Sequence, residues 1–292
     1  MRTLLSVLLL FASLSAPAQS TWERIKSAAS SMRDAVSDVS NSLQYTVPVT
    51  GRRFYNFVPD ADLLQLSTQQ YRQYMRSARR SSDATRLATV KRVSNRLASA
   101  VKRFYREQGM SDELRYLQWE FNLVRSSEVN AFCMPGGKIV VYEGIMQVAN
   151  DDASLAIVIG HEIAHAICKH SAEQMSKQMI QKYGYQIAMG MLSLSGVSST
   201  KYDIAQIAGQ VGLSLQNLRY SRQNEKEADR IGLIIAAMAG YSPDAAIPFW
   251  QRMGEQGKST STHDWYSTHP SNANRIQSLQ SFLPEARRYY RK

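Results

Sequence analysis

The sequence predicts a helix-rich α+β fold with one small, mostly antiparallel sheet. Three observations indicate this class: helical periodicity before residue 109, alternating apolar residues between 117 and 142, and helical periodicity again after Gly144. The chain has 292 residues, of which 44% are hydrophobic, enough for one large domain or two small ones. This composition excludes a disordered or collagen-like chain, and no repeat of solenoid length is visible.

The first eighteen residues have the layout of a secretory signal peptide. A basic start precedes an apolar run over 4–14, and a small-x-small cleavage site follows at 16–18. The alternative is a buried N-terminal helix. No later apolar run is long enough to cross a bilayer. We therefore expect 1–18 to be removed and the remaining chain to be exported and soluble, with peripheral membrane contact and the oligomeric state left open.

Residues 19–109 are expected to form an N-terminal helical region. Helical spacing extends over 21–43, 63–80 and 83–108. The segment Val47-Pro48-Val49-Thr50-Gly51 interrupts this pattern and predicts a turn or a linker.

Charge and cysteine content narrow the classes of partner. The net charge of +11 suits an anionic surface or acidic substrates. No basic stripe is interleaved with aromatic residues, so we expect no nucleic-acid partner. Cys133 and Cys168 are too few for a disulfide scaffold, and the sequence leaves open whether they pair.

Three extended segments precede the second helical part. Residues 119–123 alternate between apolar and polar, as in a half-buried strand. Residues 130–134 and 138–142 are separated by Pro-Gly-Gly, which predicts a hairpin. These segments form the predicted sheet.

A helix beginning near Asp152 carries metal-binding chemistry in the motif HEIAH at 161–165. Residues i and i+4 of a helix lie roughly 40° from eclipsed, so His161 and His165 leave one face and suit two ligands of a tetrahedral Zn²⁺. Glu162 is rotated by about 100° and can take a proton from a water whose pKa zinc lowers toward 7. The alternative, a surface helix with scattered histidines, fits the apolar flanks badly.

A third ligand is expected from the helix that begins near Glu225. Glu225 and Asp229 share a face, so Glu225 can bind the metal while Asp229 accepts a hydrogen bond from a ligand imidazole. We expect Glu227 to point elsewhere and to be exposed. His170, five residues after His165, is expected to point to a different face of the helix, and we interpret it as a packing or hydrogen-bonding residue rather than as a ligand. The alternative for the acidic residues is a first helical turn that complements the helix dipole.

Together these motifs resemble peptidase family M48, gluzincins with the pattern HExxH…ExxAD. The resemblance extends over roughly 116–283. Its motifs are HEIAH at 161–165, Glu225 with Ala228 and Asp229, Asn130-Ala131-Phe132 before Pro135-Gly136-Gly137, and His269-Pro270 before Arg275. It implies a zincin-like metallopeptidase domain over 110–292 that binds one Zn²⁺ per chain through His161, His165 and Glu225. Glu162 would be the general base, with Asp229 supporting a ligand from behind.

The resemblance also implies roles around the substrate. Asn130, Ala131 and Phe132 would form an edge strand that binds an extended substrate. His269 and Arg275 would face the active site as catalytic residues that stabilise the oxyanion, or His269 could cap the metal at rest. Without the resemblance, His269-Pro270 with Arg275 would be interpreted as a helix start.

The resemblance is to the soluble periplasmic members. It implies a zinc-dependent endopeptidase acting on unfolded or misassembled extracytoplasmic proteins. The alternative function is a chaperone-like binding protein whose zinc site is latched or structural. The methionine-rich segment 171–219 is left open between core packing and a mobile lid.

Overall fold

The computed structural model describes residues 43–181, 214–259, 264–270 and 274–291, together with isolated positions before residue 43. Helices dominate this part of the chain and two small sheets accompany them, so the predicted helix-rich α+β class is confirmed. The expected signal peptide, the expected helix at 21–43 and the centre of the 171–219 segment lie outside the described residues. In the described ranges no helix has both the length and the apolar character that a membrane span requires.

A three-stranded sheet has the order β3–β5–β4. Its strands are β3 (Glu120–Val124), β4 (Ala131–Met134) and β5 (Lys138–Tyr142). β4 and β5 form the predicted hairpin, with Phe132 opposite Val140, whereas β3 runs parallel to β5. The turn needs glycine because Gly136 and Gly137 have φ values of 87° and 84°. β4 is an edge strand of this sheet.

Residues 44–55 form a second, two-stranded sheet. Strands β1 (Gln44–Thr46) and β2 (Arg53–Tyr55) pair antiparallel, so the described residues form two sheets where one was predicted. The break at 47–51 is the turn of this hairpin, closed by a 2.7 Å bond from the Val47 N–H to the Arg52 carbonyl. Val47 and Phe54 are buried in the main core. The expected division between 19–109 and 110–292 stays a prediction.

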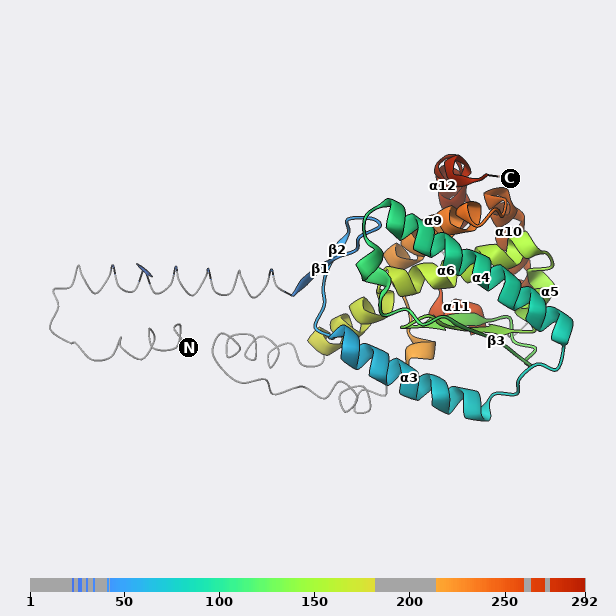
Figure 1. Ribbon diagram of the computed structural model, residues 1–292, viewed down its shortest axis with the longest axis horizontal. Coiled ribbons are helices and arrows are strands. Elements are labelled where there is room, and N and C mark those ends of the chain that lie inside the picture. The colour runs from blue at the N-terminus through green and yellow to red at the C-terminus, as the bar shows by residue number, and fades with distance from the viewer. Residues whose placement is uncertain are drawn as a thin grey trace.

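The core is built from helices on both sides of the three-stranded sheet. Figure 1 shows this sheet between α6 (Asp152–Ile167) on one side and α3 (Asp60–Ser77) on the other. On the α6 side, α4 (Ala84–Glu107) and α9 (Arg222–Met238) pack against α6, and α12 (Arg275–Tyr289) covers α9. Shorter elements are α5 (Ile145–Val148), α10 (Ala246–Ser259), α11 (Asp264–Thr268) and the 3₁₀ turns Ser111–Leu114, Leu215–Asn217 and Pro243–Ala245; 170–181 is also helical.

A pair of glycines lets α6 and α9 cross closely. A Cβ on Gly232 would lie 2.8 Å from the His161 backbone nitrogen, and a Cβ on Gly160 would lie 2.9 Å from the Gly232 carbonyl oxygen. In both cases the neighbouring atom belongs to the backbone of the other helix, which cannot move aside as a side chain could. The crossing therefore brings His161 of α6 against the middle of α9, with Asp229 and Glu225 about one and two turns before Gly232.

Replacing Gly232 with alanine should destabilise the protein. The added methyl group must push α6 and α9 apart, and such overpacking costs about 1–3 kcal/mol of unfolding free energy. The control is Gly254→Ala in α10, where a Cβ meets no described atom within 4 Å and should stabilise the helix by up to about 1 kcal/mol. Urea unfolding followed by circular dichroism measures both variants. A wild-type midpoint for Gly232→Ala would show that the crossing tolerates a side chain.

Candidate functional site

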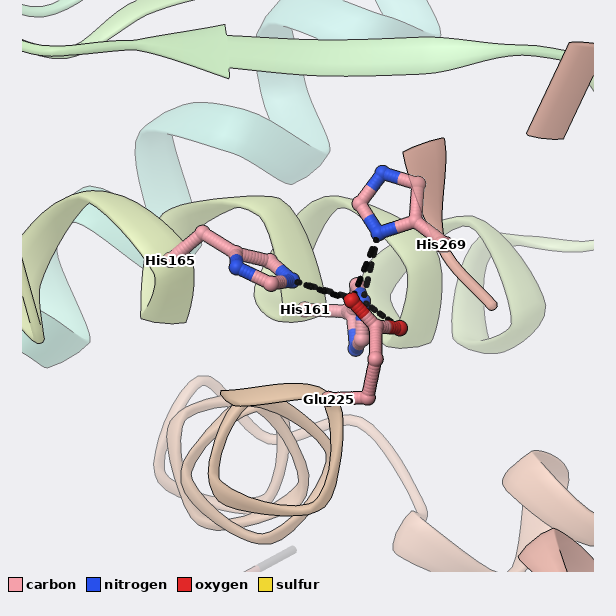
Figure 2. Close-up of side chains that lie close together, drawn as sticks. All are labelled: His161, His165, Glu225 and His269. Carbon is pink, nitrogen blue, oxygen red and sulfur yellow. Dashed lines mark hydrogen bonds and ion pairs between the residues drawn. The ribbon is translucent and has the colours of Figure 1, made fainter. Parts of the chain in front are cut away.

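Four buried side chains from separate parts of the chain converge at one point. His161 and His165 come from α6, Glu225 from the first turn of α9, and His269 directly follows α11. Their ligand atoms all lie within 4.8 Å of one another. Figure 2 shows the four side chains pointing toward one another. Each is at most 3% exposed, so water is largely excluded from the cluster.

The distances within this cluster fit a tetrahedral zinc site. Bonds of about 2.1 Å to zinc place neighbouring ligand atoms roughly 3.4 Å apart. His161 Nε2 lies 3.0 Å from His165 Nε2 and 3.5 Å from Glu225 Oε2. His165 Nε2 lies 3.4 Å from Glu225 Oε1. His269 Nδ1 is 3.4 Å from His161 Nε2 and 3.1 Å from Glu225 Oε1, at the fourth corner. Imidazole nitrogens and a carboxylate oxygen are the donors that zinc prefers.

Burial and charge put these donors in a state suited to a cation. Burial lowers the pKa of His165 well below its ordinary value, which keeps the imidazole neutral. Burial also acts to raise the pKa of Glu225. The interactions with His269, His161 and His165 outweigh it and hold that pKa well below its ordinary range. Burial opposes protonation of His161 too, but Asp229 and Glu225 raise its pKa. The carboxylates thus favour a positive charge at this point, which a bound cation can supply in place of a proton on His161.

Glu162 lies beside the cluster with one oxygen available. The Cys133 N–H of β4 donates to Glu162 Oε2 at 3.2 Å. Glu162 Oε1 is buried without a hydrogen-bond partner in the described part of the chain, 3.5 Å from His269 Nε2. Burial raises the pKa of Glu162 to about 7. A carboxylate with that pKa can exchange a proton near neutral pH.

The ion pair between Asp229 and Arg275 contacts His161 on the side of the ring away from the cluster. Asp229 Oδ1 lies 3.0 Å from His161 Nδ1, the ring nitrogen that faces away from the cluster. Arg275 donates to Asp229 from Nη2 at 2.6 Å and from Nε at 2.9 Å, and its guanidinium lies over the Trp250 ring. Arg275 Nη1 lies 3.9 Å from Glu225 Oε2 and has no hydrogen-bond partner among the described residues. Arg275 is thus buried and faces the cluster.

The backbone of β4, rather than the Phe132 side chain, faces Glu162. The Phe132 ring packs against Tyr74 and Tyr142, in the cluster under α3. The Asn130 side chain accepts a 2.9 Å bond from the Ala131 N–H at the start of the strand. The thiols of Cys133 and Cys168, whose pairing the sequence left open, are both buried and free.

The expectation that Glu227 is exposed is wrong. Glu227 is buried because the β1–β2 hairpin covers this side of α9, and its carboxylate accepts bonds from Arg52 Nε at 2.7 Å and from the Thr50 hydroxyl. His170 has the expected hydrogen-bonding role, 2.8 Å from Glu227 Oε2. Arg52 lies 175 residues from Glu227 in the sequence, so no local pattern could have predicted their pairing.

The chain matches known proteins over most of its length. Residues 91–283 match the model of peptidase family M48. The chain is 34% identical over 249 residues to the mitochondrial metalloendopeptidase OMA1 of Schizosaccharomyces pombe, covering 84% of this chain and 67% of that relative. It is 34% identical over 187 residues to the Arabidopsis thaliana enzyme of that name, covering 62% of this chain and 35% of the relative.

A bacterial relative is similar over a shorter region. The chain is 28% identical over 167 residues to the beta-barrel assembly-enhancing protease of Yersinia pestis, covering 56% of this chain and 34% of the relative. The matches thus span from about a third to two thirds of the relatives' own lengths. The family model covers well over half of this chain, and several relatives are named metalloendopeptidases. The chain therefore belongs to peptidase family M48, as a metalloendopeptidase whose cofactor is zinc.

Proposed function

We propose that this chain hydrolyses internal peptide bonds of unfolded or misassembled proteins outside the cytoplasm. The observation that carries the proposal is a zinc-compatible donor set beside a buried, unpartnered oxygen of Glu162, among the residues that the structure describes. The names of the relatives refer to mitochondria in some cases and to β-barrel assembly in others, so they do not agree on one compartment. The location outside the cytoplasm is therefore part of what we propose. It rests on the signal-peptide layout at 1–18, which implies a periplasmic location.

In this proposal each residue has a separate task. His161, His165 and Glu225 hold the ion, and Asp229 orients His161. When bound, zinc supplies a Lewis acid that polarises water and the scissile carbonyl. Glu162 accepts a proton from the attacking water and delivers it to the leaving amide nitrogen.

The substrate would bind along β4. An edge strand offers backbone N–H and C=O groups to an extended peptide, which adds to the sheet as another strand. In the proposal, Asn130, Ala131 and Phe132 present this edge, and the Cys133 N–H that now binds Glu162 marks its catalytic end. A folded protein seldom presents an extended segment, so the geometry favours unfolded chains.

Arg275 is proposed to stabilise the negative oxygen that develops on the carbonyl. Such an oxygen needs a cation or a hydrogen-bond donor placed beside it beforehand. Arg275 Nη1 faces the cluster, while the other guanidinium nitrogens are held by Asp229. The guanidinium is therefore oriented before a substrate arrives.

Cleavage of an unfolded protein tests the proposal. The full chain with equimolar zinc should cut casein at internal bonds, seen as fragments by mass spectrometry, and should leave a stable folded protein intact. A chelator should stop the reaction. A chain that holds zinc tightly and cleaves neither protein would instead favour the chaperone-like binding function.

The position of His269 is the observation that supports the chaperone-like binding function. His269 Nδ1 takes the fourth corner of the cluster, the position that an attacking water needs. A permanently capped site would bind protein without cutting it. The buried Glu162 favours an enzyme because a structural zinc site has no use for a base.

His269→Ala separates the two roles left open for His269. We propose that His269 caps the ion at rest. Its removal should then open the fourth position and speed casein cleavage several-fold at saturating zinc. The matched control is Thr268→Ala, which removes a neighbouring hydroxyl bonded to the Trp265 carbonyl and should leave the rate unchanged. Initial rates measure both variants. A slower His269→Ala variant would mean that His269 acts during the reaction.

A further inference from the structure

We propose that His170 and Glu227 set the tautomer of His165, and that the β1–β2 hairpin completes this arrangement through Thr50 and Arg52. His170 and Glu227 are then positioning residues that act through a zinc ligand. The inference rests on the ligand role proposed above for His165.

The hydrogen bonds from His165 through His170 to Glu227 all donate toward the Glu227 carboxylate. To bind zinc through Nε2, His165 must carry its proton on Nδ1. His170 Nδ1 lies 2.9 Å from His165 Nδ1, and His170 Nε2 lies 2.8 Å from Glu227 Oε2. The ionised carboxylate of Glu227 can only accept, so His170 donates from Nε2. In its neutral form the His170 ring then accepts at Nδ1. His165 must then donate from Nδ1, which leaves the lone pair of its Nε2 toward the ion.

The stacking contact of the His165 ring does not choose between its two tautomers. The ring of Tyr220 stacks on His165, with centroids 4.0 Å apart and planes 25° apart. This stacking fixes the plane of the ring, but both tautomers present the same face. The proton position therefore depends on the edge of the ring, where His170 lies.

His161 has a shorter version of the same arrangement. Its Nδ1 lies 3.0 Å from the Asp229 carboxylate, which Arg275 holds with two bonds. For His165, an imidazole is inserted between the ligand and the carboxylate. In both cases the hydrogen bonds end at a carboxylate on α9, and an arginine side chain donates to that carboxylate.

The arginine behind His165 comes from the N-terminal hairpin. Arg52 Nε donates to Glu227 at 2.7 Å, and Arg52 Nη2 lies 2.8 Å from Glu173 of the 170–181 helix. The Thr50 hydroxyl donates to the other oxygen of Glu227. Thr50 and Arg52 lie outside residues 91–283, the part that matches the family model. The hairpin thus adds charge and orientation to the site from outside the stretch that matches the family model.

A second metal ion is the competing interpretation of this cluster. One ligand atom each from Cys168, His170 and Glu227 lies within 4.8 Å of the others. The Arg52 guanidinium is already bonded to Glu227, and a cation placed beside it would be repelled. We therefore expect one zinc per chain by elemental analysis.

Zinc affinity of the full chain tests the inference. His170→Leu removes both hydrogen bonds and should weaken zinc binding about 10–100-fold in a chelator competition. His170→Gln keeps an oxygen that can accept from His165 and should recover part of this loss. Glu227→Gln and Arg52→Gln should give smaller losses in the same direction. The control is Lys177→Gln, which removes an exposed partner of Glu173 and should bind zinc as the wild type does.

Two further measurements separate positioning from stability. Thermal unfolding of the metal-free variants shows whether each one folds, and the visible spectrum of the Co²⁺-substituted chain reports the geometry at the ion. A shifted spectrum in a folded Glu227→Gln or Arg52→Gln variant supports the inference even if His170→Leu does not fold. Wild-type affinity and spectrum in every folded variant would overturn it, as would two zinc ions per wild-type chain. If His165→Ala binds zinc like the wild type, the ligand assignment in the proposed function fails instead.

Discussion

The Glu162→Gln variant is expected to keep its zinc and to lose casein cleavage. Glutamine has the shape of glutamate, and its carbonyl oxygen can still accept the Cys133 N–H that Glu162 accepts at 3.2 Å. It cannot take a proton from water at neutral pH. General-base catalysis contributes about 10²–10⁴-fold to a rate, so a loss of that order is expected. Glu162 is not one of the four converging donors, so bound zinc should remain at the wild-type level.

The control for this variant is Glu107→Gln. Glu107 is exposed at the end of α4, so the same chemical change there should alter neither zinc content nor rate. Initial cleavage rates and elemental analysis are measured on all three proteins. Wild-type cleavage by Glu162→Gln would exclude this residue as the base. A variant that loses both zinc and activity would show that Glu162 supports the ion rather than the proton transfer.

Glu225→Gln is expected to release the zinc. The carboxylate provides negative charge to a buried cluster of imidazoles, and Glu225 is 3% exposed. An amide of the same shape has no such charge and is a poor zinc ligand. Replacing a residue behind a ligand costs about 10–100-fold in metal affinity, and loss of a ligand should exceed that range. Casein cleavage should disappear at zinc concentrations that saturate the wild type.

A second carboxylate packed on α9 provides the control for Glu225. Glu285 of α12 pairs with Arg230 of α9 at 2.7 Å, and this pair is half-exposed at the surface. Glu285→Gln should weaken the contact between α9 and α12 slightly, since exposed pairs are worth about 0–1 kcal/mol, and should leave zinc affinity unchanged. If Glu225→Gln binds zinc as tightly as Glu285→Gln does, Glu225 is not a ligand.

Helical periodicity explains why the centre of the site could be predicted. Within one helix a spacing of four residues places two side chains on one face, whatever the surroundings. This rule brought His161 together with His165 on α6, and Glu225 with Asp229 on α9, as the structure has them. Pro-Gly-Gly likewise predicted the β4–β5 hairpin. These predictions needed geometry from a few neighbouring residues.

The same reasoning failed where the helix is interrupted. α6 ends at Ile167, and Lys169 has a φ of 54°, an unusual conformation for a residue with a side chain. The Lys169 ammonium is held by Asp60 at 2.7 Å and lies over the Tyr45 ring. A new helix then starts, so His170 returns toward His165 rather than facing away as in a continuous helix.

Contacts between distant segments account for the remaining differences. The parallel pairing of β3 with β5 joins strands that are not adjacent in the sequence. Glu227 is buried because a hairpin 175 residues earlier covers it. Neither the hairpin nor α9 carries a local pattern that specifies the other.

The donor types of the buried cluster, the carboxylate of Glu162 beside them and the helix-rich class follow from residue order, because short-range backbone geometry converts spacing into direction. Long-range packing decides the remaining features. It sets how α6 and α9 approach each other, which groups bond to the outer nitrogen of each imidazole, and how deeply the cluster is buried. Close contact at Gly160 and Gly232 and the Arg52–Glu227 ion pair are properties of the assembled core, where shape and desolvation act between residues far apart in the chain.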